Sequence, residues 1–277
     1  MQMKTLRMVS TLALVGTLGL AASTALATPT MVDITYNLRV FNDDPNSNLN
    51  ATDTWPAGPI TISDLQLDGD GTGGEFANLH NWRFSADGLD DAQLQNGDGF
   101  RMTADLTLTG SRAEAGLQVS PWWSPNVDGR LQIKTSDLGG EIAAFGGRLP
   151  FYSFTANHGL TYTTGDTITL EITYVPRDLD AIHPALIEYA VNYNGNDYSS
   201  GYLAFDEGNP NEDPPHGTWG LLQPFEVGGV FQPQIDVGNQ ANGSTAVWDN
   251  VTFVPEPATL ALLALGGLAV VRRKRIG

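Results

Sequence analysis

The 277-residue chain contains no cysteine. The protein therefore has no disulfide bond, no thiol nucleophile and no cysteine-ligated metal. Without disulfides, its stability has to come from core packing and from any bound ions.

Basic residues are scarce between Thr28 and Val254, where the chain has eight of them against thirty acidic residues and a net charge of −22. Nucleic acids and anionic membrane surfaces are therefore poor partners for this part of the chain. The acidic residues are mostly aspartates, 22 against 8 glutamates, which favours turns and supplies hard oxygen ligands. Most of them are expected to form a solvated acidic surface.

Catalytic motifs are also missing. The chain has no G-x-S-x-G elbow, no H-E-x-x-H helix, no P-loop and no E-x-D-x-x-E carboxylate cluster of the kind that marks one glycosidase family. Its histidines lie far apart without ligand spacing, so loop or core roles are expected rather than a zinc site: His80, His158, His183 and His216. We therefore predict a non-enzymatic protein, although acids from distant strands could still form a glycosidase pair.

Both ends of the chain carry apolar runs that are shorter than the ~20 residues a membrane-spanning helix needs. At the N-terminus, Lys4 and Arg7 precede the run from Met8 to Leu20, and residues 25–27 form an A-x-A cleavage site. This order predicts a signal peptide over residues 1–27 and a mature chain that begins at Thr28. An uncleaved N-terminal helix is the alternative, and the short run ending in small residues argues against it.

The last 23 residues, 255–277, join three features in a fixed order. A Pro-Glu-Pro triplet precedes an uncharged apolar run from Ala258 to Val271 and a terminal basic block; triplet and block consist of Pro255, Glu256, Pro257, Arg272, Arg273, Lys274 and Arg275. As a helix the run would span about 21 Å, less than a hydrocarbon core of about 30 Å, so it is a marginal permanent anchor. The basic block would stay in the cytoplasm, which leaves the preceding residues facing outward.

This tail closely resembles the PEP-CTERM sorting signal of exported bacterial proteins. The resemblance implies that an exosortase, a membrane-embedded cysteine enzyme, recognises and removes the tail, and that the host makes extracellular polysaccharide. It also implies export through the inner membrane of a Gram-negative-type bacterium, transient anchoring by the tail, and delivery to the cell surface or extracellular matrix. An ordinary tail anchor is the alternative.

Residues 28–254 are predicted to form one domain built almost wholly of β-strands. Apolar and polar residues alternate over residues 32–40, 100–109 and 167–174, which is typical of antiparallel strands with one face on a core. Shorter segments with the same pattern lie at residues 113–119, 131–135, 151–155, 186–193, 198–205 and 245–254. A short helical turn is predicted near residues 181–187. Because Gly, Pro, Asn and Asp separate the segments, we expect two packed antiparallel sheets.

The succession of these segments resembles the concanavalin A-like and laminin G-like jelly-roll sandwiches. It runs through GFRMTADLTL, AGLQVSPWW, GRLQIK, TGDTITLEITYVP, IEYAVNY, YSSGYLAFD and a closing AVWDNVTFV, which together cover about 155 residues from Gly99. In those domains the last strand carries Asp-Asn followed by apolar residues, as Asp249, Asn250, Val251 and Phe253 do here. An all-β jelly-roll β-sandwich is therefore the expected fold, and a generic β-sandwich is the alternative.

Two acidic stretches are candidate calcium sites. In the first, residues 64–75, four acids match positions 1, 5, 7 and 12 of an EF-hand loop: Asp64, Asp68, Asp70 and Glu75. Gln66 breaks the pattern, and residues 60–67 look like a strand with a bulge, so a Gly-rich hairpin tip is the alternative. The second stretch contains Asp206, Glu207, Glu212 and Asp213, and an exposed loop stiffened by prolines is its alternative.

Two aromatic segments are candidate sugar-binding loops. Trp122 and Trp123 lie between prolines in SPWWSP, and neighbours in an extended chain face opposite ways, so one indole is expected to be exposed. His216 and Trp219 follow the second acidic stretch in PPHGTWG. Flat indoles can stack on sugar rings, whereas a buried Trp with a bonded indole N–H is the alternative in each segment.

Together these features predict an exported jelly-roll protein that binds or embeds in extracellular polysaccharide, with calcium as its one candidate cofactor. A structural matrix component without a discrete ligand is the second hypothesis, and a glycan hydrolase is the third. A sugar site requires exposed aromatic side chains and converging polar groups on a sheet face. A hydrolase requires two carboxyl groups about 5 to 10 Å apart in a cleft.

Overall fold

The computed structural model of the protein describes residues 28–41, 47–65, 78–124, 127–146, 149–206, 219–221, 224–234 and 243–255. Within them the chain is almost entirely β-structure. The strands are β1 (Asp33–Phe41), β2 (Asn48–Asp53), β3 (Ile60–Leu65), β4 (Leu79–Ser85), β5 (Phe100–Gly110), β6 (Ala113–Ser124), β7 (Val127–Lys134), β8 (Ile142–Phe145), β9 (Tyr152–Ser153), β10 (Thr167–Val175), β11 (Leu186–Tyr193), β12 (Asn196–Ser199), β13 (Leu203–Ala204), β14 (Glu226–Pro233) and β15 (Ser244–Pro255). A short α-helix, α1, spans Phe154–His158, and a 3-10 helix, η1, spans Ser136–Leu138.

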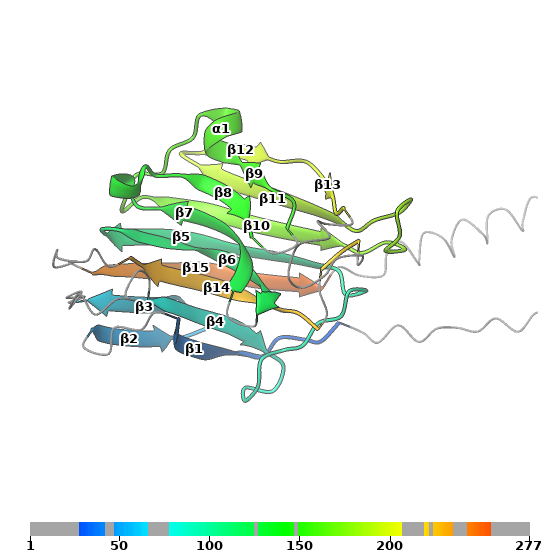
Figure 1. The fold of residues 1–277 in the computed structure, drawn as a ribbon. Coiled ribbons are helices and arrows are strands. Elements are labelled where there is room, and N and C mark those ends of the chain that lie inside the picture. The colour runs from blue at the N-terminus through cyan, green and yellow to red at the C-terminus, as the bar shows by residue number, and fades with distance from the viewer. Residues whose placement is uncertain are drawn as a thin grey trace, which may run out of the picture.

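The strands form two antiparallel sheets that pack face to face (Figure 1). The seven-stranded sheet has the order β1-β4-β14-β6-β7-β8-β9, and the eight-stranded sheet has the order β12-β11-β10-β5-β15-β3-β2 with β13 beside β11. From β3 to β6 successive strands alternate between the sheets, and β15 returns at the end to lie between β5 and β3. This crossing pattern is that of a jelly roll, so the predicted all-β, two-sheet fold class is confirmed.

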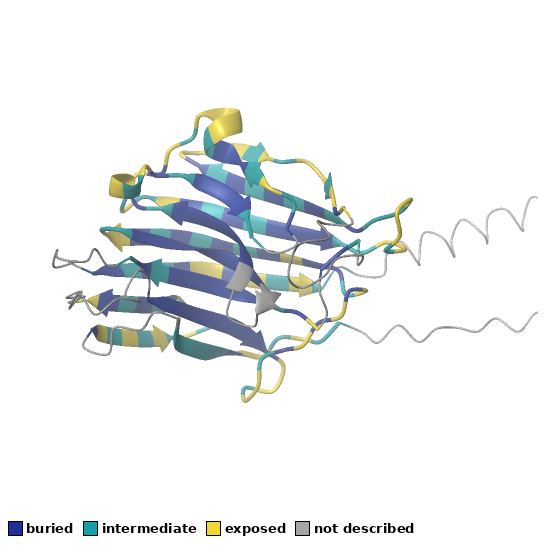
Figure 2. Ribbon diagram, in the orientation of Figure 1, coloured by how far each residue is buried: buried dark blue, intermediate teal, exposed yellow. Residues whose placement is uncertain are grey.

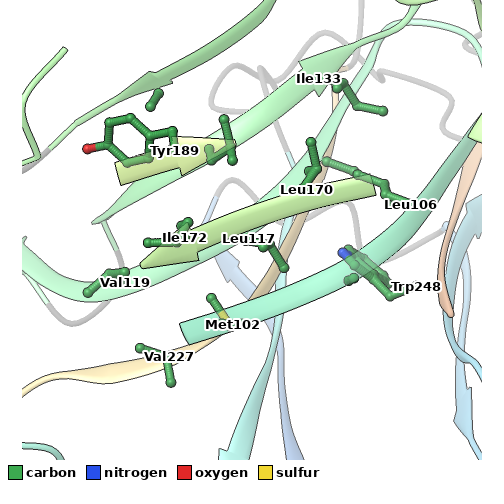
Figure 3. Packing of buried hydrophobic residues seen from close by; sticks show 14 of the residues in the cluster. Met102, Leu106, Leu117, Val119, Ile133, Leu170, Ile172, Tyr189, Val227 and Trp248 are labelled. Atoms are coloured by element: carbon green, nitrogen blue, oxygen red, sulfur yellow. The ribbon is translucent and has the colours of Figure 1, made fainter. Parts of the chain in front are cut away.

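The core lies between the sheets and is filled by the inward side of each central strand. In β5, for example, Met102 and Leu106 are fully buried while Arg101 faces solvent, because successive side chains of a strand point to opposite faces. Figure 3 shows side chains from both sheets in this core. Trp248 of β15 links the sheets: its indole N–H donates to the carbonyl of Gly116 at 3.1 Å, and its ring meets Trp82 edge-on at 6.0 Å.

The closing strand β15 contains a β-bulge at the Asp-Asn pair. The register with β5 shifts between Asp249 and Thr252, and Asn250 has a φ of 49°. Asn tolerates this left-handed conformation better than most residues because its short side chain can bond locally. Here the Asn250 amide donates to Asp105 of β5 at 2.8 Å, which fixes the bulge to the sheet.

Two local predictions are wrong. The strand predicted over residues 151–155 ends at Ser153, because the Ser153 hydroxyl accepts from the Ala156 N–H at 3.1 Å and caps α1. The helical turn predicted near residues 181–187 is absent: Asp180 accepts from the N–H groups of Ile182 and His183 at 2.8 and 2.7 Å, and β11 begins at Leu186. A carboxylate bonded to the backbone two and three residues ahead forms a turn rather than a helix.

Two strands of the seven-stranded sheet, β4 and β14, were not among the segments predicted from the sequence. All seven residues of β4 are buried (Figure 2), the polar residues Asn81, Arg83 and Ser85 on one face as well as the aromatic residues on the other. In β14, Gly228 and Gly229 interrupt the apolar residues. A strand covered on both faces, as β14 is, can lose the polar-apolar alternation by which a half-buried strand is recognised.

The predicted signal peptide and the tail after Pro255 lie outside the described residues. The division into residues 1–27, 28–254 and 255–277 therefore stays a prediction. None of the helices in the described part of the chain has the length and hydrophobicity that crossing a bilayer requires.

Candidate functional site

The face of the seven-stranded sheet that points away from the core is lined with polar side chains. On β6, residues such as Leu117 face the core, so Glu114 and Gln118 on alternate positions face outward. Strand pairing arranges these outward residues in rows across β7, β6, β14 and β4. The first row is Arg130, Gln118, Gly228 and Arg83; the second is Gln132, Gly116, Val230 and Asn81; the third, without β4, is Lys134, Glu114 and Gln232. We call these residues the outer polar face.

Most side chains of the outer polar face are buried although they point away from the core. Asn81 and Gln118 are 0% exposed, and the exposed fractions of Arg83 and Arg130 are 2% and 8%. Burial of a polar or charged group costs free energy unless the group is paired. The partners of each side chain therefore decide what this face can do.

The two buried arginines of the outer polar face are held by acids and amides. Arg83 Nη1 lies 2.6 Å from Glu226 Oε2 and 3.4 Å from Asp91 Oδ2. Arg130 Nη1 donates to Gln232 Oε1 at 2.8 Å. These contacts keep both guanidinium groups in fixed positions on the face.

Glu114 is the centre of a second group of contacts on the same face. Its carboxylate accepts from Gln132 Nε2 at 2.8 Å and from Gln234 Nε2 at 2.9 Å. Lys134 Nζ lies 3.8 Å from Glu114 and 2.8 Å from Glu141, so it joins this group to the next strand. Charges arranged in this way neutralise each other locally within an acidic protein.

Asn81 and Gln118 differ from these neighbours because neither amide has a hydrogen-bond partner. Both the oxygen and the nitrogen of each side chain are buried and unpaired. Leaving a buried donor or acceptor unpaired costs about 1 to 3 kcal/mol, and native proteins rarely do so without a ligand or an ordered water at the group. Each amide offers one acceptor and two hydrogen donors, which is the set that hydroxyl groups bind.

Two glycines lie on the outer polar face near these amides: Gly228 on β14, between the strands of the two amides, and Gly116 on the strand of Gln118. A Cβ on Gly228 would lie 2.0 Å from the Trp82 carbonyl oxygen, and one on Gly116 would lie 2.0 Å from the carbonyl oxygen of Leu131. Side chains are therefore excluded at both positions. Glycine inside a strand is typical of a place where a ligand or another backbone approaches closely.

The outer polar face cannot be recognised as a site from the sequence alone. Its residues follow the spacings E-x-G-x-Q on β6 and R-x-Q-x-K on β7, which are the same as those of an ordinary solvent-facing strand. The glycines within β6 and β14 are the sequence feature that points to this face. Glycine weakens a strand, so its presence there indicates a position where a ligand or another backbone comes close.

The aromatic candidates are only partly within the described residues. Strand β6 extends to Ser124, so Trp122 and Trp123 lie in a strand rather than in a loop, beyond the register shift that follows Val119; their side chains lie outside the described part. His216 is also outside it. Trp219 is half-buried with a φ of 49°, and its carbonyl accepts from the Ala185 N–H at 2.8 Å. Sugar binding by these residues stays a prediction.

Asp64, the first acid of the predicted calcium loop, is fully buried at the end of β3. Its Oδ2 accepts from Asn78 Nδ2 at 2.7 Å and from His80 Nε2 at 2.9 Å. His80 Nδ1 accepts from the Arg39 N–H at 3.1 Å, so its hydrogen is on Nε2. Burial raises the pKa of Asp64, but the hydrogen bonds from His80 and Asn78 outweigh this effect and hold the pKa below its usual range.

Of the remaining predicted calcium ligands, only Asp206 lies within the described residues. Asp206 is exposed after β13, whereas the other predicted ligands lie outside the described residues: Asp68, Asp70, Glu75, Glu207, Glu212 and Asp213. Both calcium sites stay predictions. The structure does bring together one group that the sequence analysis did not consider, Asp178, Asp180 and His183, whose ligand atoms lie within 4.8 Å of one another at the surface.

The outer face of the eight-stranded sheet carries a groove of about 350 Å³ over β10, β11 and β12. Arg101 and Glu171, which line it, form an ion pair at 2.5 Å. Asn192, also in the lining, donates to Asp197 at 2.7 Å. These polar groups already pair with one another, so the groove offers a weaker recognition surface than the outer polar face.

Three carboxyl groups, those of Asp64, Asp87 and Asp180, have a pKa below the usual range. Backbone N–H groups of the following turn are the cause at Asp87 and Asp180. A lowered pKa keeps these three carboxylates ionised near neutral pH, which does not suit the proton donor of a glycosidase.

Comparison with solved structures finds several of similar fold. A functionally unknown protein from Saccharomyces cerevisiae is 10% identical with a TM-score of 0.44, over 81% of this chain and 97% of that chain. The alginate lyase from Klebsiella pneumoniae is 9% identical with a TM-score of 0.43, over 75% and 85%. The cellulose-induced protein Cip1 is 15% identical with a TM-score of 0.40, over 80% and 91%. No curated protein matches the chain.

Residues 253–275 match the model of the PEP-CTERM protein-sorting motif. The match begins inside β15 at Phe253, whose ring stacks on Phe100 with the centroids 5.8 Å apart. The motif implies export, C-terminal anchoring before cleavage, an exosortase as the processing partner, and a cell-surface destination. The protein is therefore a jelly-roll β-sandwich that carries a PEP-CTERM sorting motif at its C-terminus.

Proposed function

We propose that the β-sandwich binds an extracellular polysaccharide through the outer polar face once the protein has been exported. The observation that carries this proposal is the pair of buried, unpaired amides of Asn81 and Gln118 on a face that points away from the core. Amide groups of this kind form hydrogen bonds with sugar hydroxyls in both directions.

The spacing of the two amides favours a polymer over a single sugar. Gln118 lies on β6 and Asn81 on β4, with β14 between them. Two strand spacings separate the residues by about 10 Å across the sheet. A ligand that contacts both amides therefore has to be elongated, and Gly228 adds no side chain between them.

The alternative is a structural matrix component without a discrete ligand. One observation favours it: Arg83, Arg130 and Glu114 already pair with residues of the same protein. A face whose polar groups pair internally can serve packing within a matrix without recognising a particular glycan. The unpaired amides are the feature that this alternative does not explain.

Substitution of the amides by leucine separates the two functions. Leucine is close in shape to Asn and Gln, and replacing an unpaired buried polar group by an apolar one is neutral or stabilising. We therefore expect Gln118→Leu and Asn81→Leu to keep or raise the unfolding free energy of the processed protein and to lower its binding to polysaccharide at least tenfold. The measurements are urea unfolding and retention on a panel of immobilised bacterial polysaccharides.

Asn192→Leu is the matched control, because it makes the same kind of change on the outer face of the other sheet. It should leave polysaccharide binding unchanged. If neither amide substitution lowers binding, the matrix-component alternative is favoured. If all three variants lose binding equally, the outer polar face is not the site.

A further inference from the structure

The sorting motif follows the folded body with almost no spacer. Strand β15 stays paired with β5 as far as Pro255, which lies opposite Phe100. Two residues earlier, Phe253 packs against Phe84 and Phe100 with ring centroids 5.4 and 5.8 Å apart. The apolar run of the tail begins at Ala258, three residues after Pro255. Three fully extended residues reach only about 10 Å.

The short spacer fixes the orientation of the anchored protein. While the tail holds the protein at the membrane, the end of the sandwich at Pro255 has to stay close to the bilayer. In Figure 1 the tip of β15 lies at the end of the sandwich where β10 also finishes and β5 starts. We call this the tail end. Its other elements are the start of β1, the segment after β4, and the segment between β10 and β11.

The tail end has exposed apolar side chains on several separate segments. The most exposed are Leu89, after β4, at 81%, and Ile182, between β10 and β11, at 77%. Val32 and Val254 are about half exposed at the same end, at 54% and 49%. Leu65 lies at the opposite end, because it follows Asp64, which pairs with the first residue of β15.

We propose that the tail end docks on the surface of the lipid bilayer before the tail is removed, with Leu89 and Ile182 in the interfacial layer. Apolar side chains gain free energy when they leave water for the boundary between headgroups and acyl chains. The membrane-held tail keeps the tail end near the lipid, because a β-sandwich held within about 10 Å of the membrane at Pro255 cannot turn this end away.

The charges at the tail end select the kind of lipid. Four exposed aspartates lie on the same two segments as the apolar residues: Asp87, Asp90, Asp178 and Asp180. Anionic lipids would repel them, whereas a zwitterionic surface would not. The partner that fits is therefore a bilayer surface rich in zwitterionic phospholipid.

The absence of cysteine allows a direct test on the full-length, unprocessed chain. Single variants Leu89→Cys, Ile182→Cys and Leu65→Cys are labelled with a fluorophore and reconstituted in phosphatidylcholine vesicles that contain a lipid-borne quencher. We expect at least twofold quenching at positions 89 and 182 and none at position 65. The 11 residues of β5 separate the two ends by about 35 Å, beyond the reach of a contact quencher.

A linker variant shows whether the short spacer holds the tail end on the lipid. Twenty Gly and Ser residues inserted between Val254 and Pro255 keep the Pro-Glu-Pro triplet intact and add a mean reach of about 25 Å. Quenching at positions 89 and 182 should then fall toward that at position 65.

Three outcomes overturn the proposal. In the first, no label is quenched in the unmodified chain. In the second, position 65 is quenched as strongly as position 89. In the third, positions 89 and 182 become protected only when the sorting enzyme is added, which would assign the tail end to that enzyme instead of the lipid.

Discussion

At the scale of single residues, the buried polar groups of this protein fall into two kinds. The Oδ2 of Asp64 has partners within the fold, because Asn78 and His80 both donate to it. Asn81 and Gln118 have none. A paired buried carboxylate contributes to stability and makes it depend on pH, whereas an unpaired buried amide costs free energy until a partner binds it.

The lowered pKa of Asp64 predicts a loss of stability in acid. A carboxyl group whose pKa is lower in the folded than in the unfolded state stabilises the fold above its unfolded pKa of about 3.9 and loses this contribution as pH falls through the folded pKa. We expect the unfolding free energy to fall below about pH 4 and to fall less steeply in Asp64→Asn, which cannot ionise. Urea unfolding at a series of pH values measures both curves, and parallel curves would show that Asp64 contributes nothing to the acid sensitivity.

At the scale of elements, the strands of the seven-stranded sheet depend on glycines that allow close approach. Gly228 of β14 lies beside Arg83 of β4 and Gln118 of β6. A Cβ there would overlap the backbone of β4, which cannot move away as a flexible side chain would. The same glycine therefore serves the packing of the sheet and adds no side chain between Arg83 and Gln118 on the outer polar face.

Gly228→Ala should destabilise the protein, and Gly97→Ala is the matched control. Overpacking of this kind costs about 1 to 3 kcal/mol, and the added methyl group at Gly228 would lie 2.0 Å from the Trp82 carbonyl oxygen. At Gly97 no atom lies within 4 Å of the added Cβ, so the change should stay within about 0.5 kcal/mol. Thermal and urea unfolding of the two variants test this, and equal stability would mean that β4 and β14 adjust without strain.

At the scale of the whole molecule, the charge of −22 between residues 28 and 254 dominates. Such an excess keeps the protein soluble but destabilises the compact state by self-repulsion. Cations that bind the folded state would relieve part of this repulsion. The lack of disulfides makes any such contribution more important to an exported protein.

The predicted calcium sites can be tested through this effect. A bound divalent ion stabilises the folded state by about 2.7 kcal/mol at a hundredfold excess over its dissociation constant. We expect the melting temperature to rise in millimolar calcium and to rise much less in sodium chloride of the same ionic strength. A rise of equal size in both salts would indicate charge screening without a specific calcium site.

The sequence by itself determined the fold class and the destination of the protein. Regular alternation, as in β5 and β10, marks strands that are covered on one side only, and the ordered tail after Val254 is a linear signal that needs no fold to be read. The position of the closing strand was also predictable, although its bulge at Asn250 was not. These features depend on residues that are neighbours along the chain.

Only the tertiary structure decided which polar residues form a candidate site. Asn81 and Gln118 are far apart in the sequence and lie near each other because β14 pairs with both β4 and β6. The tail end is likewise assembled from segments that the sheets bring to one side, around Leu89, Ile182 and Val254. Strand pairing over long sequence separations, and the burial that follows from it, cannot be read from local periodicity, because a polar residue at an outward position has the same spacing whether water or other residues cover it.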